Sequence, residues 1–198
     1  MLIVEVADLE RRRGVIESAL AEGVDAVQLR DRRAGGGSLF AAATALRALT
    51  HATGALLLVN DRIDVALAAS ADGVHLPGSS FPIPAARRLV GPERWIGRST
   101  HSPEEAAAAA DAGADYVILG PVFPTPSKSG LGSPLGVAAI AAARLPVPLI
   151  AIGGITADAV PALRRAGAHG IAVSRAVLDA PDPRAAARAL VGALREPS

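Results

Sequence analysis

Short apolar runs alternate with alanine-rich helical stretches along the whole chain. One pattern recurs four times, a helical stretch followed by a glycine and a short β-branched run, at 21–30, 70–77, 111–120 and 165–174. Glycine suits the left-handed position just beyond a helix C-terminus, so each copy predicts a helix that leads into a strand. Four other apolar runs, each followed by helical spacing, lie between the copies at 2–6, 55–60, 95–99 and 148–152. The pattern therefore predicts eight strands that alternate with eight helices.

The strand runs are apolar on both faces, which indicates a parallel sheet covered by helices. Helix starts are expected where Ser102 precedes Pro103 and where Thr156 opens the stretch 156–166, because serine and threonine cap helix N-termini and proline favours the first turn. Eight strand-helix units in 198 residues predict an α/β fold, a single-domain (β/α)8 TIM barrel over residues 1–198. An open doubly wound sheet is the alternative.

Composition limits the classes of partner. The formal net charge is +1 and aromatic residues make up 3% of the chain, so no aromatic side chains interleave with the arginines to form a nucleic-acid platform. The absence of cysteine excludes disulfides and thiolate chemistry. No apolar run is long enough to span a membrane, and the short apolar N-terminus precedes its arginines, the reverse of a secretory signal. We therefore expect a cytoplasmic protein with a small-molecule ligand and neither nucleic acid nor a membrane as a partner.

Polar side chains lie where the predicted strands end. In a (β/α)8 barrel the active site is built from the loops at the C-terminal ends of the strands. Because side chains alternate along a strand, Gln28 and Arg30 share one face of their strand, and Ser99 and His101 share one face of theirs. The sequence therefore predicts an inward-facing site at this end of the barrel.

Gly153 and Gly154 stand between a buried strand and a helix, where bare amides can approach an anion. Barrels often hold phosphate at the loops after strands seven and eight. We therefore predict that phosphate binds the amides of these glycines together with the backbone after the eighth strand, at Ala172, Val173 and Ser174. The alternative is a tight turn that needs glycine only for its geometry.

Two arginines and one carboxylate are candidates for a charged ligand. Arg30, with Arg32, is suited to clamp a phosphate or pyrophosphate, unless Arg30 forms an ion pair with Asp31 instead. Asn60 and Asp61 offer hard oxygen ligands for Mg²⁺. The alternative for Asp61 is to cap the helix expected at 62–70.

Three residues are candidates for proton transfer or charge stabilisation. His75 and His101 can exchange a proton near neutral pH, although His75 also fits a hydrogen-bonded core position and His101 a residue that orients its loop. Lys128 is the only lysine of the chain, in the loop GPVFPTPSKSG at 120–130, while every other basic residue apart from histidine is arginine. Its compact ammonium suits a phosphate oxygen or a developing charge, and chance survival of the lysine is the alternative.

Taken together, these segments resemble the superfamily of thiamine phosphate synthase and the TenI-like thiazole tautomerases. The resemblance rests on the ordered motifs VQLRDR at 27–32, VNDR at 59–62, GVHL at 73–76, GPVFPTPSK at 120–128 and AIGGIT at 151–156. It implies a (β/α)8 barrel, often a homodimer, that handles the phosphorylated thiazole of thiamine in the cytoplasm. Thr125, in the GPVFPTPSK loop, is included among the expected phosphate-binding residues.

For the synthase branch, the resemblance implies that a pyrimidine pyrophosphate loses pyrophosphate with the help of Mg²⁺ and that the thiazole nitrogen attacks the resulting cation. The residues that fall on the pyrophosphate and metal positions of that branch are Arg30, Asn60, Asp61, Ser99 and Lys128. Ser80 departs from the branch, because it stands where the synthase has a second metal-binding aspartate. A neutral hydroxyl lacks the charge that holds Mg²⁺.

The strings HLPGSSF at 75–81 and IGRSTHS at 96–102 look more like the tautomerase branch, which needs no metal. That branch moves a proton to aromatise a thiazole carboxylate phosphate, and its characterised members use a histidine where this chain has Pro121. The predicted function is a TenI-like thiazole tautomerase without a cofactor, with Lys128, His101 and His75 as candidate catalytic residues. Two alternatives stay open: a thiamine phosphate synthase that uses Mg²⁺ bound by Asp61, and a non-catalytic ligand-binding regulator.

Overall fold

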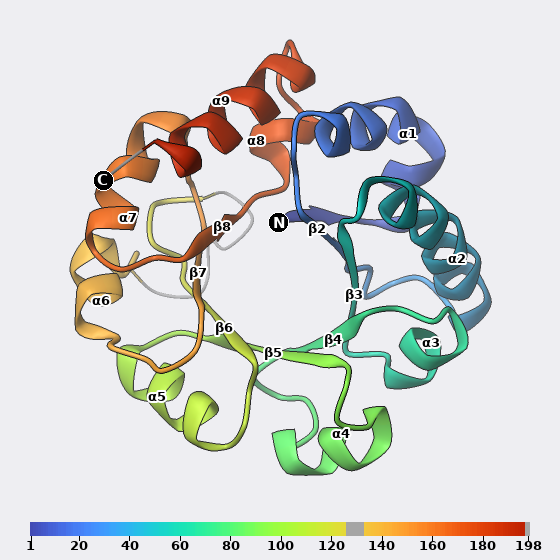
Figure 1. Ribbon diagram of the computed structural model, residues 1–198, viewed down its shortest axis with the longest axis horizontal. Helices are drawn as coiled ribbons and strands as arrows, with labels where there is room; N and C mark the ends of the chain where they lie inside the picture. Colours follow the sequence, from blue (N-terminus) through green and yellow to red (C-terminus); the bar gives the residue numbers. More distant parts are fainter. Residues whose placement is uncertain (126–132, 197–198) are drawn as a thin grey trace.

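The structure, a computed structural model, describes residues 1–125 and 133–196. Eight parallel strands pair in the order β1 to β8, and a bridge between Leu2 and Val173 brings the end of β8 back to β1. Figure 1 shows these strands as an inner ring with the helices outside it. This arrangement confirms the predicted (β/α)8 barrel and excludes the open doubly wound sheet.

The strands follow the predicted apolar runs closely; their bounds are β1 (Leu2–Val4), β2 (Ala26–Leu29), β3 (Leu56–Asn60), β4 (Gly73–Leu76), β5 (Trp95–Thr100), β6 (Tyr116–Leu119), β7 (Leu149–Ile152) and β8 (Gly170–Ala172). The helices are α1 (Val6–Ala21), α2 (Gly36–Thr53), α3 (Ile63–Ala68), α4 (Ile83–Val90), α5 (Pro103–Asp111), α6 (Gly136–Ala142), α7 (Val160–Arg165), α8 (Arg175–Leu178) and α9 (Pro183–Arg195), with a 3-10 turn, η2 (Ala157–Ala159), before α7. The Ser102 side chain caps α5 as predicted, since its Oγ accepts a hydrogen bond from the Glu105 amide.

Three of the four recurring segments turn from helix to strand at a left-handed glycine, as predicted, and these are Gly23, Gly113 and Gly167. The copy at 70–77 corrects the prediction, because its left-handed residue is Ser70, with a φ of 52°. The glycine of that copy, Gly73, lies inside β4, where a Cβ would come within 2.2 Å of the Trp95 carbonyl oxygen. It serves the close packing of β4 against β5.

Aspartates in these recurring segments tie neighbouring strands together at the N-terminal end of the barrel. The Asp72 carboxylate accepts a hydrogen bond from the Leu57 amide at 2.7 Å and another from the Arg47 guanidinium at 2.9 Å. The Asp115 carboxylate, just before β6, likewise accepts hydrogen bonds from the Ile96 amide and from the Arg87 guanidinium. These two aspartates of the recurring segments are therefore explained by strand pairing rather than by a catalytic role.

The barrel interior forms a hydrophobic cluster separate from the larger core between the strands and the helices. Its buried members are Ala26, Leu58, Tyr116, Ile118 and Ala172. Gly97 of β5 leaves room for the tyrosine, since a Cβ there would lie 2.0 Å from the Tyr116 ring. The ring can therefore cross toward β4.

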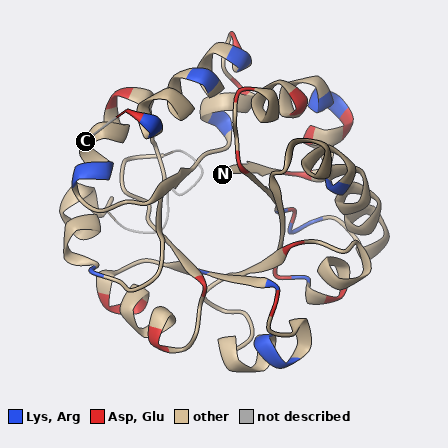
Figure 2. Cartoon of the chain, viewed as in Figure 1, with Lys and Arg blue, Asp and Glu red and all other residues tan. Residues whose placement is uncertain are grey.

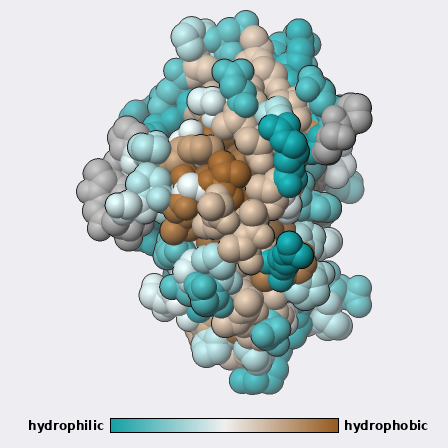
Figure 3. All heavy atoms as spheres, turned by 90° about the vertical axis from the view of Figure 1, so that its left-hand side faces the viewer, coloured by the Kyte–Doolittle hydropathy of each residue, from teal (hydrophilic) through white to brown (hydrophobic). Residues whose placement is uncertain are grey.

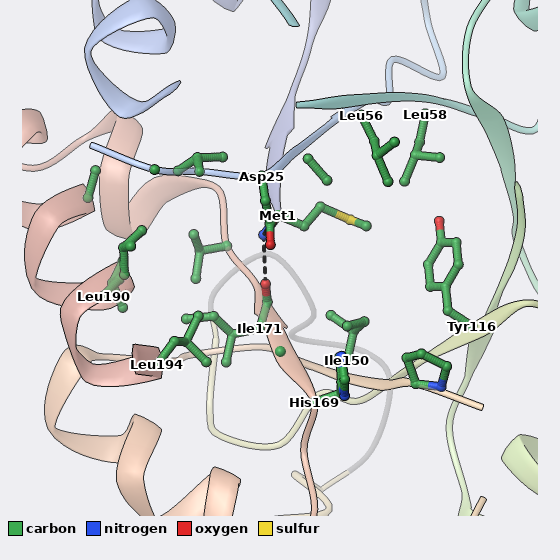
Figure 4. A pocket seen from close by; sticks show the side chains of 18 of the residues that line it. Met1, Asp25, Leu56, Leu58, Tyr116, Ile150, His169, Ile171, Leu190 and Leu194 are labelled. Carbon is green, nitrogen blue, oxygen red and sulfur yellow. Dashed lines mark hydrogen bonds and ion pairs between the residues drawn. The ribbon is translucent and has the colours of Figure 1, made fainter. Parts of the chain in front are cut away.

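A cavity of about 620 Å³ opens at the N-terminal ends of the strands. In Figure 4, Leu56, Leu58 and Ile150 line this cavity from the strands, while Leu190 and Leu194 line it from α9. Its surface is largely apolar, in contrast to the opposite end of the barrel. Of the candidate residues within the described ranges, Val173 alone contributes to the lining of this cavity.

Charged residues of both signs lie mainly on the helices and loops around the ring, whereas the strands carry few (Figure 2). On the side where α6 and α7 lie, hydrophobic residues gather in one area bordered by hydrophilic ones (Figure 3). Within residues 1–125 and 133–196, no helix has the length and apolar character needed to cross a membrane.

Candidate active site

A cavity of about 820 Å³ lies at the C-terminal ends of the strands, where the site was expected. It is lined by many of the residues singled out from the sequence, namely Gln28, Arg30, Arg32, Asn60, His75, Ser99, His101 and Ser174. They come from five different strands or from the loops that follow them. Side-chain alternation explains this convergence, because inward-facing positions near the strand ends point to the same space.

His75 is buried and lies between two hydroxyl groups. Its Nδ1 is 3.1 Å from the Tyr116 hydroxyl and its Nε2 is 2.7 Å from Ser99 Oγ. Sequence reasoning missed Tyr116, which lies across β5 from His75 at the level of Gly97. Strand alternation could have found it, because Tyr116 and Ile118 face the barrel interior together.

His101 is exposed at the cavity rim and binds the end of the neighbouring strand. Its Nδ1 lies 2.6 Å from the Gly120 carbonyl oxygen, and its amide donates to the Glu105 carboxylate at 2.7 Å. A carbonyl oxygen only accepts hydrogen bonds, so Nδ1 carries a proton in this arrangement. These contacts orient the loop after β5, as the alternative for His101 anticipated.

The cationic wall of the cavity is formed by Arg30 and Arg32. Burial, followed by the nearby Arg32 charge, lowers the pKa of Arg30, although a guanidinium remains charged at physiological pH. No ion pair joins Arg30 to Asp31, whose carboxylate accepts hydrogen bonds from the amides of Arg33 and Ala34. The carboxylate that acts on Arg30 is that of Glu5, which also lines the cavity.

Asp61 directly follows Asn60 of the cavity lining but does not itself line the cavity, and it has a left-handed conformation with a φ of 64°. Its amide donates to the His75 carbonyl oxygen at 2.9 Å, which joins the ends of β3 and β4. Its carboxylate accepts a hydrogen bond from the Ser80 hydroxyl. The alternative capping role is wrong, because α3 begins after Arg62 and has no side-chain cap.

The Asp61–Ser80 pair, whose chain neighbours Asn60 and Ser79 line the cavity, is the group of residues best suited to a divalent cation. Within the described ranges, no three His, Cys, Asp or Glu side chains are grouped as a metal site would require. Mg²⁺, however, is usually bound by one or two carboxylates and by substrate phosphates, and keeps several waters. One carboxylate beside a hydroxyl therefore fits Mg²⁺ that arrives with a phosphorylated substrate better than Mg²⁺ bound by the protein alone.

Both glycines of the predicted phosphate loop have positive φ, 101° at Gly153 and 63° at Gly154. A Cβ at Gly153 would lie 2.7 Å from Cα of Pro121, and one at Gly154 would lie 2.4 Å from the Pro124 carbonyl oxygen. Packing against the loop after β6 is thus sufficient to require glycine at both positions. Phosphate binding by their amides stays a prediction.

The backbone after β8 is only partly available to an anion. The Val173 amide donates to the Met1 carbonyl oxygen at 3.2 Å, and the Val173 carbonyl oxygen accepts from the Ile3 amide at 2.8 Å. These bonds close the barrel between β8 and β1, while Ala172 is buried in the barrel interior. Of the three predicted residues, Ser174 alone lines the cavity.

Arg175, which sequence reasoning did not propose as a ligand, extends past the end of β7 to the loop after β6. It lines the cavity, and its guanidinium donates to Thr125 Oγ1 at 3.2 Å. The pattern of strand ends could have suggested Arg175, since it follows Ser174 directly. Lys128 lies outside the described residues, so its predicted role stays a prediction.

A (β/α)8 barrel with polar side chains gathered at the C-terminal ends of its strands has the arrangement of a barrel enzyme. The family model described as "Thiamine monophosphate synthase" (TMP-TENI) matches residues 1–177. The chain therefore belongs to the thiamine phosphate synthase and TenI superfamily.

Individual relatives of this chain have more specific names than the family model. A thiamine-phosphate synthase of Methanoculleus marisnigri is 51% identical over 174 residues, 87% of this chain and 82% of that protein. One of Mycobacterium tuberculosis is 45% identical over 203 residues, 94% of this chain and 91% of that protein. The structure of a thiamine phosphate pyrophosphorylase from Pyrococcus furiosus is 35% identical, with a TM-score of 0.87 over 98% of this chain and 94% of that one.

These comparisons correct the predicted function. The sequence favoured a thiazole tautomerase, chiefly because Ser80 replaces an aspartate, whereas relatives at 45% to 51% identity are named thiamine-phosphate synthases. One changed residue weighs less than similarity along nearly the whole chain. The tautomerase prediction is therefore wrong, and the synthase alternative is the better supported.

Proposed function

We propose that this protein is a thiamine-phosphate synthase, a transferase that joins a hydroxymethylpyrimidine pyrophosphate to a thiazole phosphate and releases pyrophosphate. The observation that carries the proposal is the shared cavity lined by Arg30, Asn60 and Ser99, together with the relatives named for this activity. Paired arginines suit a pyrophosphate, whose oxygens accept two hydrogen bonds from one guanidinium. We expect the reaction to take place in the cytoplasm.

In the reaction, the bond between the pyrimidine methylene carbon and the pyrophosphate oxygen breaks, and pyrophosphate leaves with the electron pair. The thiazole nitrogen then donates its lone pair to the methylene carbon, which forms thiamine phosphate. Arg30 and Arg32 would bind the leaving pyrophosphate and offset its charge. Asn60 and Ser99 would orient it by hydrogen bonds, so that the thiazole nitrogen and the methylene carbon face each other.

Mg²⁺, held by Asp61 and Ser80 together with pyrophosphate oxygens, would supply positive charge to the leaving group. The remaining contacts to the pyrophosphate would come from the protein side chains named above. The thiazole phosphate would lie near Gly154, Ser174 and Arg175, on the far side of β1 from Arg30, and the Arg175 guanidinium already donates to Thr125. This separation gives each substrate its own cationic group.

Growth complementation tests this proposal. A bacterial strain that lacks its own thiamine-phosphate synthase should grow without thiamine when it expresses this protein. Arg30→Ala should abolish that growth, while Arg33→Ala, which alters an exposed arginine outside the cavity lining, should preserve it. Absence of growth with the parent protein at normal expression would contradict the proposal.

A further inference from the structure

Tyr116, His75 and Ser99 form one hydrogen-bonded chain that runs from the barrel interior to the cavity. Tyr116 is buried among Leu58, Ile118 and other interior residues, and Ser99 lines the cavity. Nδ1 of His75 is 3.1 Å from the tyrosine hydroxyl, and Nε2 is 2.7 Å from the serine hydroxyl. Both imidazole nitrogens therefore contact a hydroxyl of the chain.

The direction of these hydrogen bonds follows from the tyrosine. Burial, and to a lesser extent the Asp115 carboxylate, raises the pKa of Tyr116 well above its ordinary value, so its hydroxyl keeps its proton. Within the described part of the chain, Nδ1 of His75 is the one hydrogen-bond partner of this hydroxyl. A buried donor without an acceptor is costly, so the tyrosine donates to Nδ1.

The histidine then has a defined tautomer. Because Nδ1 accepts, a neutral imidazole carries its proton on Nε2 and donates it to Ser99 Oγ. Ser99 Oγ thus accepts a hydrogen bond from the protein side, and its own hydroxyl proton is left to point into the cavity.

We propose that Tyr116 is a positioning residue for pyrophosphate binding: by fixing the tautomer of His75, it makes the Ser99 hydroxyl a hydrogen-bond donor toward an oxygen of the pyrophosphate group. The proposal rests on the proposed function for the identity of the ligand. Gly97 is part of the same device, because a Cβ there would lie 2.0 Å from the tyrosine ring. Gly97 thus gives the ring its path from β6 to His75.

The test uses inorganic pyrophosphate as the ligand, so it does not depend on turnover. Tyr116→Phe keeps the ring and removes the hydroxyl, and calorimetry should show pyrophosphate binding weakened by about three- to tenfold, the effect of one hydrogen bond. Ser99→Ala should weaken binding at least as much. The double variant should match Ser99→Ala alone, because the tyrosine acts through the serine.

A second readout follows the histidine itself. Nitrogen-15 NMR should find the His75 proton on Nε2 in the parent, and a mixture of tautomers or protonated forms in Tyr116→Phe. Thr50→Val is a matched control, since it removes another buried hydroxyl, one that donates to the Arg47 carbonyl oxygen in α2. It should lower stability without changing pyrophosphate affinity or the His75 signal.

Three results would overturn the proposal. They are a parent His75 protonated on Nδ1, a Tyr116→Phe protein that binds pyrophosphate as the parent does, and additive effects in the double variant. If the parent binds pyrophosphate as expected but makes no thiamine phosphate, the proposed function fails while the role of Tyr116 stands. If thiamine phosphate forms and Tyr116→Phe changes neither affinity nor tautomer, the role of Tyr116 fails alone.

Discussion

The Ser80 hydroxyl donates a hydrogen bond to the Asp61 carboxylate, beside Asn60 and Ser79 of the C-terminal cavity lining. A carboxylate at position 80 would add a second negative charge next to Asp61. The pair therefore offers one carboxylate to a cation, as the proposed Mg²⁺-assisted reaction requires. The substrate then has to supply part of the coordination.

Ser80→Asp should raise the affinity for Mg²⁺ in the absence of substrate, because it adds a carboxylate beside Asp61. The parent should bind Mg²⁺ weakly until pyrophosphate is added. Calorimetry with Mg²⁺ alone measures the difference, and Ser79→Asp, which adds the same charge one residue away, is the matched control. Tight Mg²⁺ binding by the parent protein without substrate would contradict the view that the Ser80 hydroxyl, in place of a carboxylate, keeps the Mg²⁺ affinity low.

Arg175→Ala should raise the KM for the thiazole phosphate by about ten- to a hundredfold, the effect of losing a charge-assisted hydrogen bond of about 1.5–3 kcal/mol. The KM for the pyrimidine pyrophosphate should change little, because Arg30 and Arg32 follow β2, on the far side of β1 from Arg175. Steady-state kinetics with each substrate varied in turn separates the two effects. Arg165→Ala, at an exposed position of α7, serves as the control. Equal changes in both KM values would contradict this prediction, because they would mean that Arg175 contributes to the positive potential of the whole cavity and not to the binding of one substrate.

Lys128→Arg should not be conservative. Arginine keeps the charge but presents a broad planar fork in place of a compact ammonium, so both Lys128→Arg and Lys128→Ala should lose about ten- to a hundredfold in kcat/KM if the lysine contacts a phosphate. This prediction rests on the sequence, since the residue lies outside the described ranges. Kinetics identical to the parent in both variants would mean that the lysine survived by chance.

Glu22 should make folding stability depend on pH. Hydrogen bonds from Arg188 and then Arg184 lower its pKa from 4.5 to about 2, and these contacts join the end of α1 to α9. A carboxylate with a depressed pKa stabilises the folded state above its unfolded pKa, and loses that contribution as the pH falls through the folded value. Parent and Glu22→Gln should therefore differ in free energy of unfolding at neutral pH and converge between about 4.5 and about 2.

Chemical denaturation at several pH values measures this difference. Glu17→Gln is the control, because the exposed pair of Glu17 with Arg13 lies within one helix at 2.8 Å and joins no second element. It should show a smaller effect. A gap between parent and Glu22→Gln that stays constant down to the lowest pH would contradict the assignment.

The barrel could be predicted from the sequence because each repeat contains local signals for the end of a helix and the start of a buried strand. Left-handed glycines such as Gly23 and Gly113 follow helices, and each β-branched run after them is buried on both faces. The site could be located for a similar reason, since barrel geometry brings residues at strand ends together wherever they stand in the chain. Gln28, Arg30, Ser99 and His101 could thus be grouped without coordinates.

What could not be predicted depends on pairings between distant residues. Tyr116 is an ordinary aromatic core residue in the sequence, and only its contact with His75 gives it a further role. The Val173 amide looked available to phosphate, but the bond to Met1 that closes the barrel uses it. Ser80 pointed to the wrong reaction, because a substitution within one motif cannot show how much of the cation's coordination the substrate provides.

The synthase assignment is tested most directly by supplying the purified protein with hydroxymethylpyrimidine pyrophosphate, thiazole phosphate and Mg²⁺, and measuring both products. We predict that thiamine phosphate and pyrophosphate form in equal amounts, only when both substrates are present, and that omitting Mg²⁺ or replacing Arg30 with alanine greatly slows the reaction. No thiamine phosphate from a protein that binds both substrates would contradict the assignment.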